Sequence, residues 1–304
     1  MIDTKVTVAG VGFQNPVITG SGTFGFGKEY GEYVDLNELG GITLKGLTLK
    51  MRKGNKPPRI AETPAGILNS VGLQNPGVNY FVTRELPELK KYHTRLIANI
   101  AGNTIEEYCE MAEILSASDI DMVEMNISCP NVKEGGVAFG VCPATVEEIT
   151  KAVRARCSKP LVVKLSPNVA DIAEIARAAE AGGADVLSLI NTLLGMKIDV
   201  RTRRPVLANN VGGLSGPAVK PVAVRMVWQV YNAVKLPLIG MGGIASGEDA
   251  VEFLLAGASL VSVGTYNFVN PTASLDVKRG IEDYMERYGV KKVADLIGAV
   301  QPND

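Results

Sequence analysis

Short apolar runs alternate with amphipathic stretches along the whole chain. The apolar runs are rich in β-branched residues, which favour strands, whereas apolar residues that recur about every 3.6 positions favour helices. The sequence therefore predicts eight strands, near residues 16–21, 41–48, 95–102, 122–128, 161–166, 186–192, 237–241 and 260–264. It predicts helices near 76–91, 104–118, 144–157, 169–182, 217–234, 247–257 and 271–287.

The helix predicted at 104–118 has both a start signal and a clear apolar face. Thr104 and Glu107 have the spacing of a capping box, in which each side chain satisfies a backbone N–H of the first turn. One apolar stripe follows at helical spacing, formed by Tyr108, Met111, Ala112 and Leu115. Glycines at 182, 183 and 257 mark the ends of two later helices.

Regular alternation of strand and helix indicates a parallel sheet. Eight such units without a change of composition favour a closed (β/α)8 TIM barrel over a doubly wound sheet, with residues 1–304 forming a single domain. The segment Lys5–Phe13 alternates and turns at Ala9, which predicts a β-hairpin closing the barrel floor. Residues 193–216 are too long for a simple turn, so we expect an excursion over the barrel mouth after the sixth strand.

Composition excludes several classes of protein. The chain has 304 residues and a net charge of −1, from 31 basic and 32 acidic side chains, so no strong field favours nucleic acid or an anionic membrane. The first residues have no apolar signal core, and no apolar run approaches the roughly 18 residues of a membrane span. The four cysteines form no metal-like cluster, so the sequence predicts a cytoplasmic protein with reduced thiols and no metal site.

Polar residues interrupt strands that should be almost wholly apolar. Lys45 and Lys164 each occur within a predicted strand, while Glu124, Asn126 and Ser128 share one face of residues 122–128. A buried ammonium group needs an anionic or electron-rich partner. Both lysines lie near carboxyl ends of strands, where barrels bind ligands, so a ligand is the favoured partner. An internal pair with Glu124 is the alternative.

Glycines follow the last two predicted strands, at Gly240–Ile244 and at Gly264. Backbone N–H groups can approach a phosphate there, as barrels often arrange after strands seven and eight. Tight turns without a ligand are the alternative. Asparagines begin several of the loops and suit a planar heterocycle, although each one alone is more often turn chemistry. They are Asn69, Asn99, Asn126, Asn131 and Asn191.

Cys129 is the main candidate for acid–base chemistry. It follows the strand predicted at 122–128 and is held between Ser128 and Pro130. His93, the only histidine, follows a charged helix end and is expected at the surface. Residues 130–142 contain Gly135, Gly136 and Gly140 and are expected to form a lid that excludes water. A buried structural thiol is the alternative for Cys129.

Ten segments, in order along nearly the whole chain, resemble class 1 dihydroorotate dehydrogenases, specifically the class 1B catalytic subunit. They are Gly20–Gly25, Thr43–Gly46, Glu62–Gly66, Asn69–Gly77, Asn126–Asn131, Lys164–Asn168, Ile190–Thr192, Gly212–Gly216, Gly240–Ile244 and Gly264–Thr265. The resemblance implies one FMN per chain, and an oxidoreductase that converts (S)-dihydroorotate to orotate in pyrimidine (UMP) biosynthesis. Under that resemblance, Cys129 is the general base that takes a proton from C5, and the flavin accepts the hydride from C6.

The resemblance also assigns residues to each ligand. Lys164 would stabilise negative charge on the reduced flavin, and Lys45 would serve both flavin and the substrate carboxylate. The flavin site would comprise Ser21, Lys45, Gly46, Asn99, Asn126, Lys164, Ile190, Gly216, Gly242, Gly243, Gly264 and Thr265. The substrate site would comprise Lys45, Asn69, Ser70, Val71, Gly72, Leu73, Asn126, Asn191 and Thr192, with Asn131 as a further candidate.

The stretch 131–136 and the following Phe139 resemble class 1B rather than the fumarate-using class 1A. Class 1B implies a partner subunit with FAD and a [2Fe–2S] cluster, NAD⁺ as final acceptor, and a heterotetramer containing a dimer of this chain. A class 1A homodimer that uses fumarate is the nearest alternative. A dihydropyrimidine-reducing relative, a flavin-free phosphate-binding isomerase or lyase, and a non-catalytic binding module are further alternatives.

Overall fold

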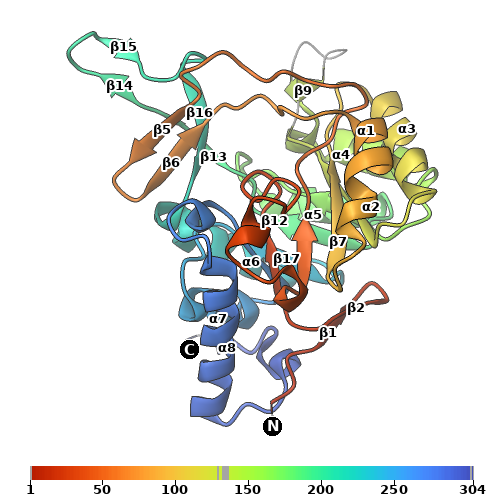
Figure 1. The fold of residues 1–304 in the computed structure, drawn as a ribbon, viewed down its shortest axis with the longest axis vertical. Coiled ribbons are helices and arrows are strands. Elements are labelled where there is room, and N and C mark those ends of the chain that lie inside the picture. The colour runs from red at the N-terminus through yellow and green to blue at the C-terminus, as the bar shows by residue number, and fades with distance from the viewer. Residues whose placement is uncertain (1, 129, 132–136, 302, 304) are drawn as a thin grey trace.

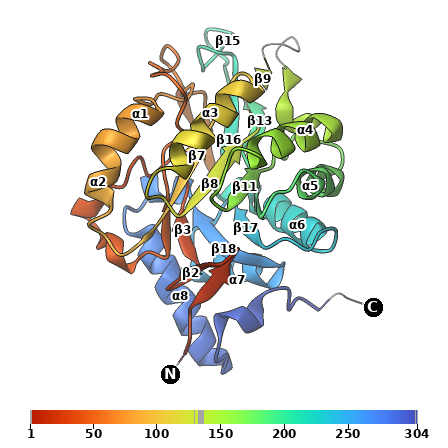
Figure 2. The same ribbon diagram turned by 90° about the vertical axis from the view of Figure 1, so that its right-hand side faces the viewer.

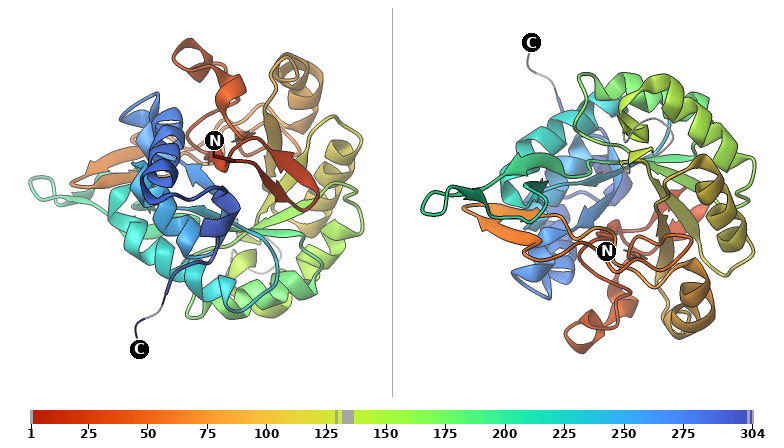
Figure 3. Two further views of the ribbon diagram at one scale, coloured as in Figure 1. Left: turned by 90° about the horizontal axis from the view of Figure 1, so that it is seen from below. Right: turned by 90° about the horizontal axis from the view of Figure 1, so that it is seen from above.

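The computed structural model describes residues 2–128, 130–131, 137–301 and 303. Eight parallel strands close into a barrel, each pairing with the next and the last pairing with the first. End-on views show the helices arranged around it (Figure 3). The strands in chain order are β3 (Val17–Thr19), β4 (Gly41–Thr43), β7 (Arg95–Ile100), β8 (Met122–Asn126), β11 (Leu161–Lys164), β12 (Val186–Leu189), β17 (Leu238–Met241) and β18 (Ala258–Val263). The predicted (β/α)8 barrel and all eight of its strands are confirmed.

Helices follow the strands as the periodicity predicts. They are α3 (Ile105–Ser116), α4 (Pro143–Arg154), α5 (Ile172–Ala181), α6 (Lys220–Tyr231), α7 (Gly247–Leu255) and α8 (Ala273–Tyr288). In Figure 2, α4, α5 and α6 cover one side of the barrel. The predicted stripe of α3 is wholly buried. Its cap differs in one detail, because Thr104 accepts from the Glu107 N–H but the Glu107 carboxylate accepts from the Asn103 N–H.

The helix predicted at 76–91 is divided into three pieces. The α-helical turns α1 (Val78–Tyr80) and α2 (Leu86–Leu89) flank a π-helical segment, Phe81–Glu85. Pro87 has no N–H to donate to the carbonyl four residues earlier, which disrupts the regular pattern. The Leu86 N–H bonds to the Phe81 carbonyl, five residues back, as in a π-turn.

The N-terminal hairpin is confirmed, with β1 (Val6–Val8) antiparallel to β2 (Val11–Phe13). The excursion after the sixth barrel strand is also confirmed, and it contains strands. β13 (Leu193–Met196) and β16 (Val211–Ser215) form a four-stranded sheet with β6 (Gly66–Asn69) and β5 (Ile60–Thr63). A short hairpin of β14 (Ile198–Asp199) and β15 (Arg204–Pro205) extends beyond it. Figure 1 shows this sheet at the opposite end of the barrel from the N-terminal hairpin.

One large hydrophobic cluster fills the barrel and the space between barrel and helices. A second, small cluster of Ala61, Leu68 and Leu207 lies under the four-stranded sheet. Within the part of the chain that the structure describes, short 3-10 segments connect several of these elements, including Pro217–Val219 before α6 and Thr265–Phe268 after β18. Among the described residues, no helix is both long and apolar enough to cross a membrane.

Candidate active site

A cavity of about 340 Å³ opens at the carboxyl ends of the barrel strands. All eight strands contribute to its wall, through their last residues or the loops that follow them. The outer part of the wall comes from β5, β6 and β16 of the four-stranded sheet. Residues far apart in the sequence therefore meet in one cleft, because parallel barrel strands end at the same edge.

Every predicted flavin-site and substrate-site residue that the structure describes in full lines this cleft. Cys129 lies outside the described residues, and so do the lid glycines Gly135 and Gly136. Asn131 is described only as part of the short strand β9 (Pro130–Asn131), which pairs with β10 (Val137–Ala138). Gly140 packs against Ile127, whose carbonyl accepts its N–H at 2.8 Å.

Two glycines of the predicted cradle adopt backbone conformations that favour glycine. Gly242 and Gly243 have φ angles of 124° and 83°, which side-chain-bearing residues rarely adopt. A Cβ on Gly243 would lie 2.9 Å from the backbone nitrogen of Lys220 and 3.0 Å from the carbonyl of Gly216. A Cβ on Gly264 would meet nothing within 4 Å, so the backbone there faces open space in the cleft.

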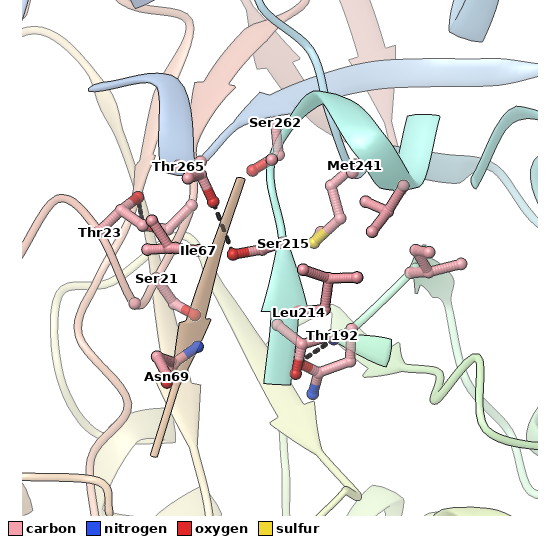
Figure 4. A pocket seen from close by; sticks show the side chains of 18 of the residues that line it. Ser21, Thr23, Ile67, Asn69, Thr192, Leu214, Ser215, Met241, Ser262 and Thr265 are labelled. Atoms are coloured by element: carbon pink, nitrogen blue, oxygen red, sulfur yellow. Dashed lines mark hydrogen bonds between the residues drawn. The ribbon is translucent and has the colours of Figure 1, made fainter. Parts of the chain in front are cut away.

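Two serines that line the cleft near this cradle, Ser215 and Ser262, were not among the site residues predicted from the sequence. The Ser262 hydroxyl, on β18, is buried and has no hydrogen-bond partner among the described residues. Figure 4 shows the hydroxyls of Ser215 and Thr265 pointing toward one another, and Thr265 Oγ1 donates to Ser215 Oγ at 2.8 Å. A serine within an apolar strand is a weak signal that could have indicated Ser262. Apolar lining residues such as Ile67, Met241 and Phe268 give no such signal.

The two predicted lysines differ in their partners. Lys164 Nζ lies 3.9 Å from Glu124 Oε2, and both side chains are buried. The alternative of an internal pair is therefore correct for Lys164, although this lysine also lines the cleft. No ion pair of Lys45 is found among the described residues, and burial, followed by the charge of Arg59, lowers the pKa of its ammonium group. Of the two lysines, only Lys164 has an internal counter-charge among the described residues.

The asparagines form a connected polar wall. Asn191 Nδ2 donates to Asn126 Oδ1 at 3.1 Å and to Ser128 Oγ at 2.8 Å. Asn126 Oδ1 also accepts the Ser128 N–H. Both acceptor bonds use the amide oxygen of Asn126, which leaves its amide nitrogen to donate to a ligand. This network fixes Ser128 immediately before the predicted base.

His93, Cys109 and Cys157 do not line the cleft. His93 is exposed, as expected. Cys109 lies on α3, and Cys157 is buried just after α4. Within the described residues no group of three or more histidine, cysteine, aspartate or glutamate side chains could hold a metal ion. The fold and the cleft together define a (β/α)8-barrel protein with a polar cleft at the carboxyl ends of its strands, where such barrels bind ligands.

Comparison with known proteins identifies the family to which this barrel protein belongs. A model of the dihydroorotate dehydrogenase family matches residues 3–285, and the chain belongs to that family. It is 60% identical over 299 residues to a protein of Alkaliphilus metalliredigens named dihydroorotate dehydrogenase B (NAD(+)), catalytic subunit, covering 98% of this chain and 99% of that protein. Proteins with the same name are 57% identical in Lachnoclostridium phytofermentans and 54% identical in Bacteroides fragilis. Each of these matches covers 99% of this chain and 100% of the relative.

Proposed function

We propose that this chain is the flavin-binding catalytic subunit of a dihydroorotate dehydrogenase that oxidises (S)-dihydroorotate to orotate in pyrimidine biosynthesis. The observation that carries the proposal is the cleft itself. It joins a glycine cradle, two lysines and a wall of asparagines within a chain of this family. An anionic pyrimidine and a phosphate-bearing flavin together require these groups.

The residues present fit FMN. The open backbone at Gly264 and the buried, unpartnered Ser262 hydroxyl suit a phosphate or another polar group at the cradle. Gly216, Gly242, Gly243 and Thr265 would surround that end. Ser21, Lys45, Gly46, Asn99, Asn126, Lys164 and Ile190 would contact the ring system. When bound, FMN supplies the acceptor for the hydride that leaves C6 of dihydroorotate.

The substrate would occupy the part of the cleft lined by Lys45, Asn69–Leu73, Asn126, Asn191 and Thr192. Lys45 would bind the carboxylate, because it is a half-buried cation without an internal ion pair among the described residues. The amide nitrogen of Asn126 would donate to a ring carbonyl. These contacts would orient the C5–C6 bond and exclude water from it.

Cys129 is our candidate for the general base that removes the proton from C5. A thiol with an ordinary pKa of about 8.5 is partly ionised near neutrality and can accept a proton. Its neighbour Ser128 is tied to Asn126 and Asn191, both of which line the cleft. That arrangement of neighbours supports a position for the thiol at the substrate.

The electrons would leave through a second protein. Relatives at 54–60% identity are named NAD(+)-linked catalytic subunits, which supports a separate electron-transfer subunit for this chain. We propose that this partner carries FAD and a [2Fe–2S] cluster, and that two copies of each subunit form a heterotetramer with NAD⁺ as the final acceptor.

The test is the visible absorption spectrum of the purified chain without oxygen, before and after dihydroorotate is added. We expect a flavin spectrum that dihydroorotate bleaches. A colourless chain that takes up no added FMN would contradict the proposal and favour a flavin-free barrel isomerase or lyase. Dihydrouracil and dihydrothymine serve as control substrates, and bleaching by either of them rather than by dihydroorotate would indicate a dihydropyrimidine enzyme.

A further inference from the structure

Four polar side chains, two in the cleft wall and two behind it, meet on four neighbouring barrel strands. In the strand register, Asn99 of β7 lies opposite Glu124 of β8, and Lys164 of β11 lies opposite Ser188 of β12. Asn99 and Lys164 line the cleft, whereas Glu124 and Ser188 lie deeper in the barrel. Glu124 is the only carboxylate among the four, and the function proposed above assigns it no role.

Glu124 is 1% exposed, yet both of its carboxylate oxygens have partners. Oε1 accepts from Ser188 Oγ at 2.7 Å, and Oε2 accepts from Asn99 Nδ2 at 2.5 Å. Lys164 Nζ lies 3.9 Å from Oε2. A carboxylate this deeply buried is tolerated because it has two donors and a cation, and its removal would leave the Lys164 charge uncompensated.

The carboxylate fixes the direction of the Asn99 amide. A carboxylate can only accept, so Asn99 must direct its amide nitrogen toward Glu124. Asn99 Oδ1 then points to Gly46, where a Cβ would lie only 2.8 Å from it. Both residues line the cleft. The cleft therefore presents an acceptor at this position, suited to an N–H group of a heterocycle.

The same carboxylate sets the local charge. Lys164 is the cation that would face the flavin ring, and Glu124 is its ion-pair partner. With both present, the charges nearly cancel behind the cleft wall. Without the carboxylate, a buried positive charge would attract the negative charge that the ring acquires on reduction, and low-dielectric surroundings would amplify that attraction.

We propose that Glu124 is a positioning residue that orients Asn99 and Lys164 toward the bound flavin and limits how strongly Lys164 favours the reduced ring. This inference rests on the proposed function, because it requires that the cleft hold a flavin. It makes Glu124 a determinant of the reduction potential although it does not line the cleft.

The test compares Glu124→Gln with two control variants, by potentiometric titration of the bound flavin. Glu124→Gln should increase the preference of the protein for reduced over oxidised flavin at least tenfold. That change corresponds to a shift of about +30 mV in the reduction potential of a two-electron couple. Ser188→Ala, which removes one donor but neither charge, should shift the potential much less. Glu124→Asp, which restores the charge, should return the potential toward that of the wild type.

A second measurement needs no turnover. Quenching of FMN fluorescence by the apoprotein measures the binding of oxidised flavin. Glu124→Gln should bind it about tenfold more weakly than the wild type. The reason is that glutamine can donate as well as accept, so it no longer fixes the direction of the Asn99 amide. An unchanged potential in Glu124→Gln, or an equal shift in Ser188→Ala, would overturn the inference. A wild-type chain that binds no flavin would contradict the proposed function as well.

Glu124→Gln removes a buried partner and could prevent folding, which circular dichroism would reveal. In that case Lys164→Gln is compared with the double variant Glu124→Gln/Lys164→Gln, which buries no lone charge. The double variant should have the higher potential of the two, because it lacks the carboxylate that opposes reduction. Equal potentials in this pair would also overturn the inference.

Discussion

At the residue scale, the chemistry depends on a few side chains whose surroundings change their properties. Lys45 and Lys164 have the same side chain, but only Lys164 has a carboxylate partner among the described residues. Burial, followed by the charge of Arg59, lowers the pKa of the Lys45 ammonium group. A lysine without a counter-charge is suited to bind one from a ligand. The sequence predicted that both lysines need partners, but it could not show which of them already has one.

Lys45 predicts a pH dependence of orotate binding. Its pKa is lowered from 10.5 by burial and by Arg59, so the ammonium loses its proton at a lower pH than an ordinary lysine. Orotate should therefore bind constantly near neutrality and progressively more weakly as pH rises through this lowered pKa. Arg59→Gln should move that decline to higher pH, because it removes one of the two causes. Titration of orotate into the oxidised enzyme at several pH values measures both effects.

Lys45→Met should weaken orotate binding at pH 7 by about 10- to 100-fold, the loss of one hydrogen bond to a charged group. Binding in this variant should no longer decline at high pH. If orotate binding to Lys45→Met still weakened at high pH, the pH dependence would belong to another titratable group.

Cys129→Ala should retain its flavin but reduce it slowly with dihydroorotate. The loss of a general base typically costs about 10²- to 10⁴-fold in rate. Anaerobic stopped-flow absorbance measures the rate directly. Cys142→Ala is the matched control, since Cys142 is exposed and does not line the cleft. Reduction of Cys129→Ala at the wild-type rate would remove this thiol from the mechanism.

At the element scale, local sequence signals located the strands and helices well, and failed where distant segments decide. Ser246 caps α7 by accepting from the Asp249 N–H, which is the kind of local contact that a sequence signal can indicate. The strands β5 and β6 were not predicted. Each has four residues, and β6 is stabilised by pairing with β16, more than 140 residues later. A short strand without a strong alternating pattern is defined by its partner rather than by its own sequence.

Asp249 connects the start of α6 to the loop that follows Gly242 and Gly243. Its carboxylate accepts from Lys220 Nζ at 2.6 Å, near the start of α6, and from the Ala245 N–H at 2.9 Å. Burial alone would raise the pKa of Asp249, but these hydrogen bonds and the Lys220 charge outweigh it and lower the pKa. Because its pKa is lowered, the carboxylate stabilises the fold at pH values above its ordinary pKa of about 3.9. This contribution is lost as the pH falls through the pKa of the folded state.

Asp249→Asn should therefore destabilise the protein at pH 7 by about 1.5–3 kcal/mol, and the difference from wild type should shrink in acid. Urea unfolding at pH 7 and near pH 3 measures this difference. Glu248→Gln, at an exposed position in the same helical turn, is the control and should change stability by less than about 0.5 kcal/mol. An equal loss at both pH values would show that the charge of Asp249 does not contribute.

At the scale of the whole molecule, the barrel brings eight strand ends together and so builds one cleft from the entire chain. The four-stranded sheet adds a wall on one side, with Asn69 and Ser215 on neighbouring strands β6 and β16. The site thus needs nearly the full length of the chain, which agrees with the 98–99% coverage by its relatives.

The lone chain should reduce no NAD⁺, but should pass electrons from dihydroorotate to an artificial dye. Addition of a partner subunit with FAD and [2Fe–2S] should restore NAD⁺ reduction. Spectrophotometry at the NADH band, with and without the partner, measures the difference. Rapid turnover of the lone chain with fumarate would instead indicate the class 1A reaction.

The sequence by itself determined the barrel, because apolar periodicity and strand–helix alternation are local signals repeated eight times. Lysines, glycines and asparagines at predicted strand ends indicated part of the cleft, and the family resemblance implied the other predicted lining residues. Only the tertiary structure decided that Glu124 pairs with Lys164, that Lys45 has no such pair among the described residues, and that β6 joins β16. Those contacts join residues on different strands, and no local pattern specifies which of several buried polar groups will lie within hydrogen-bond distance of another.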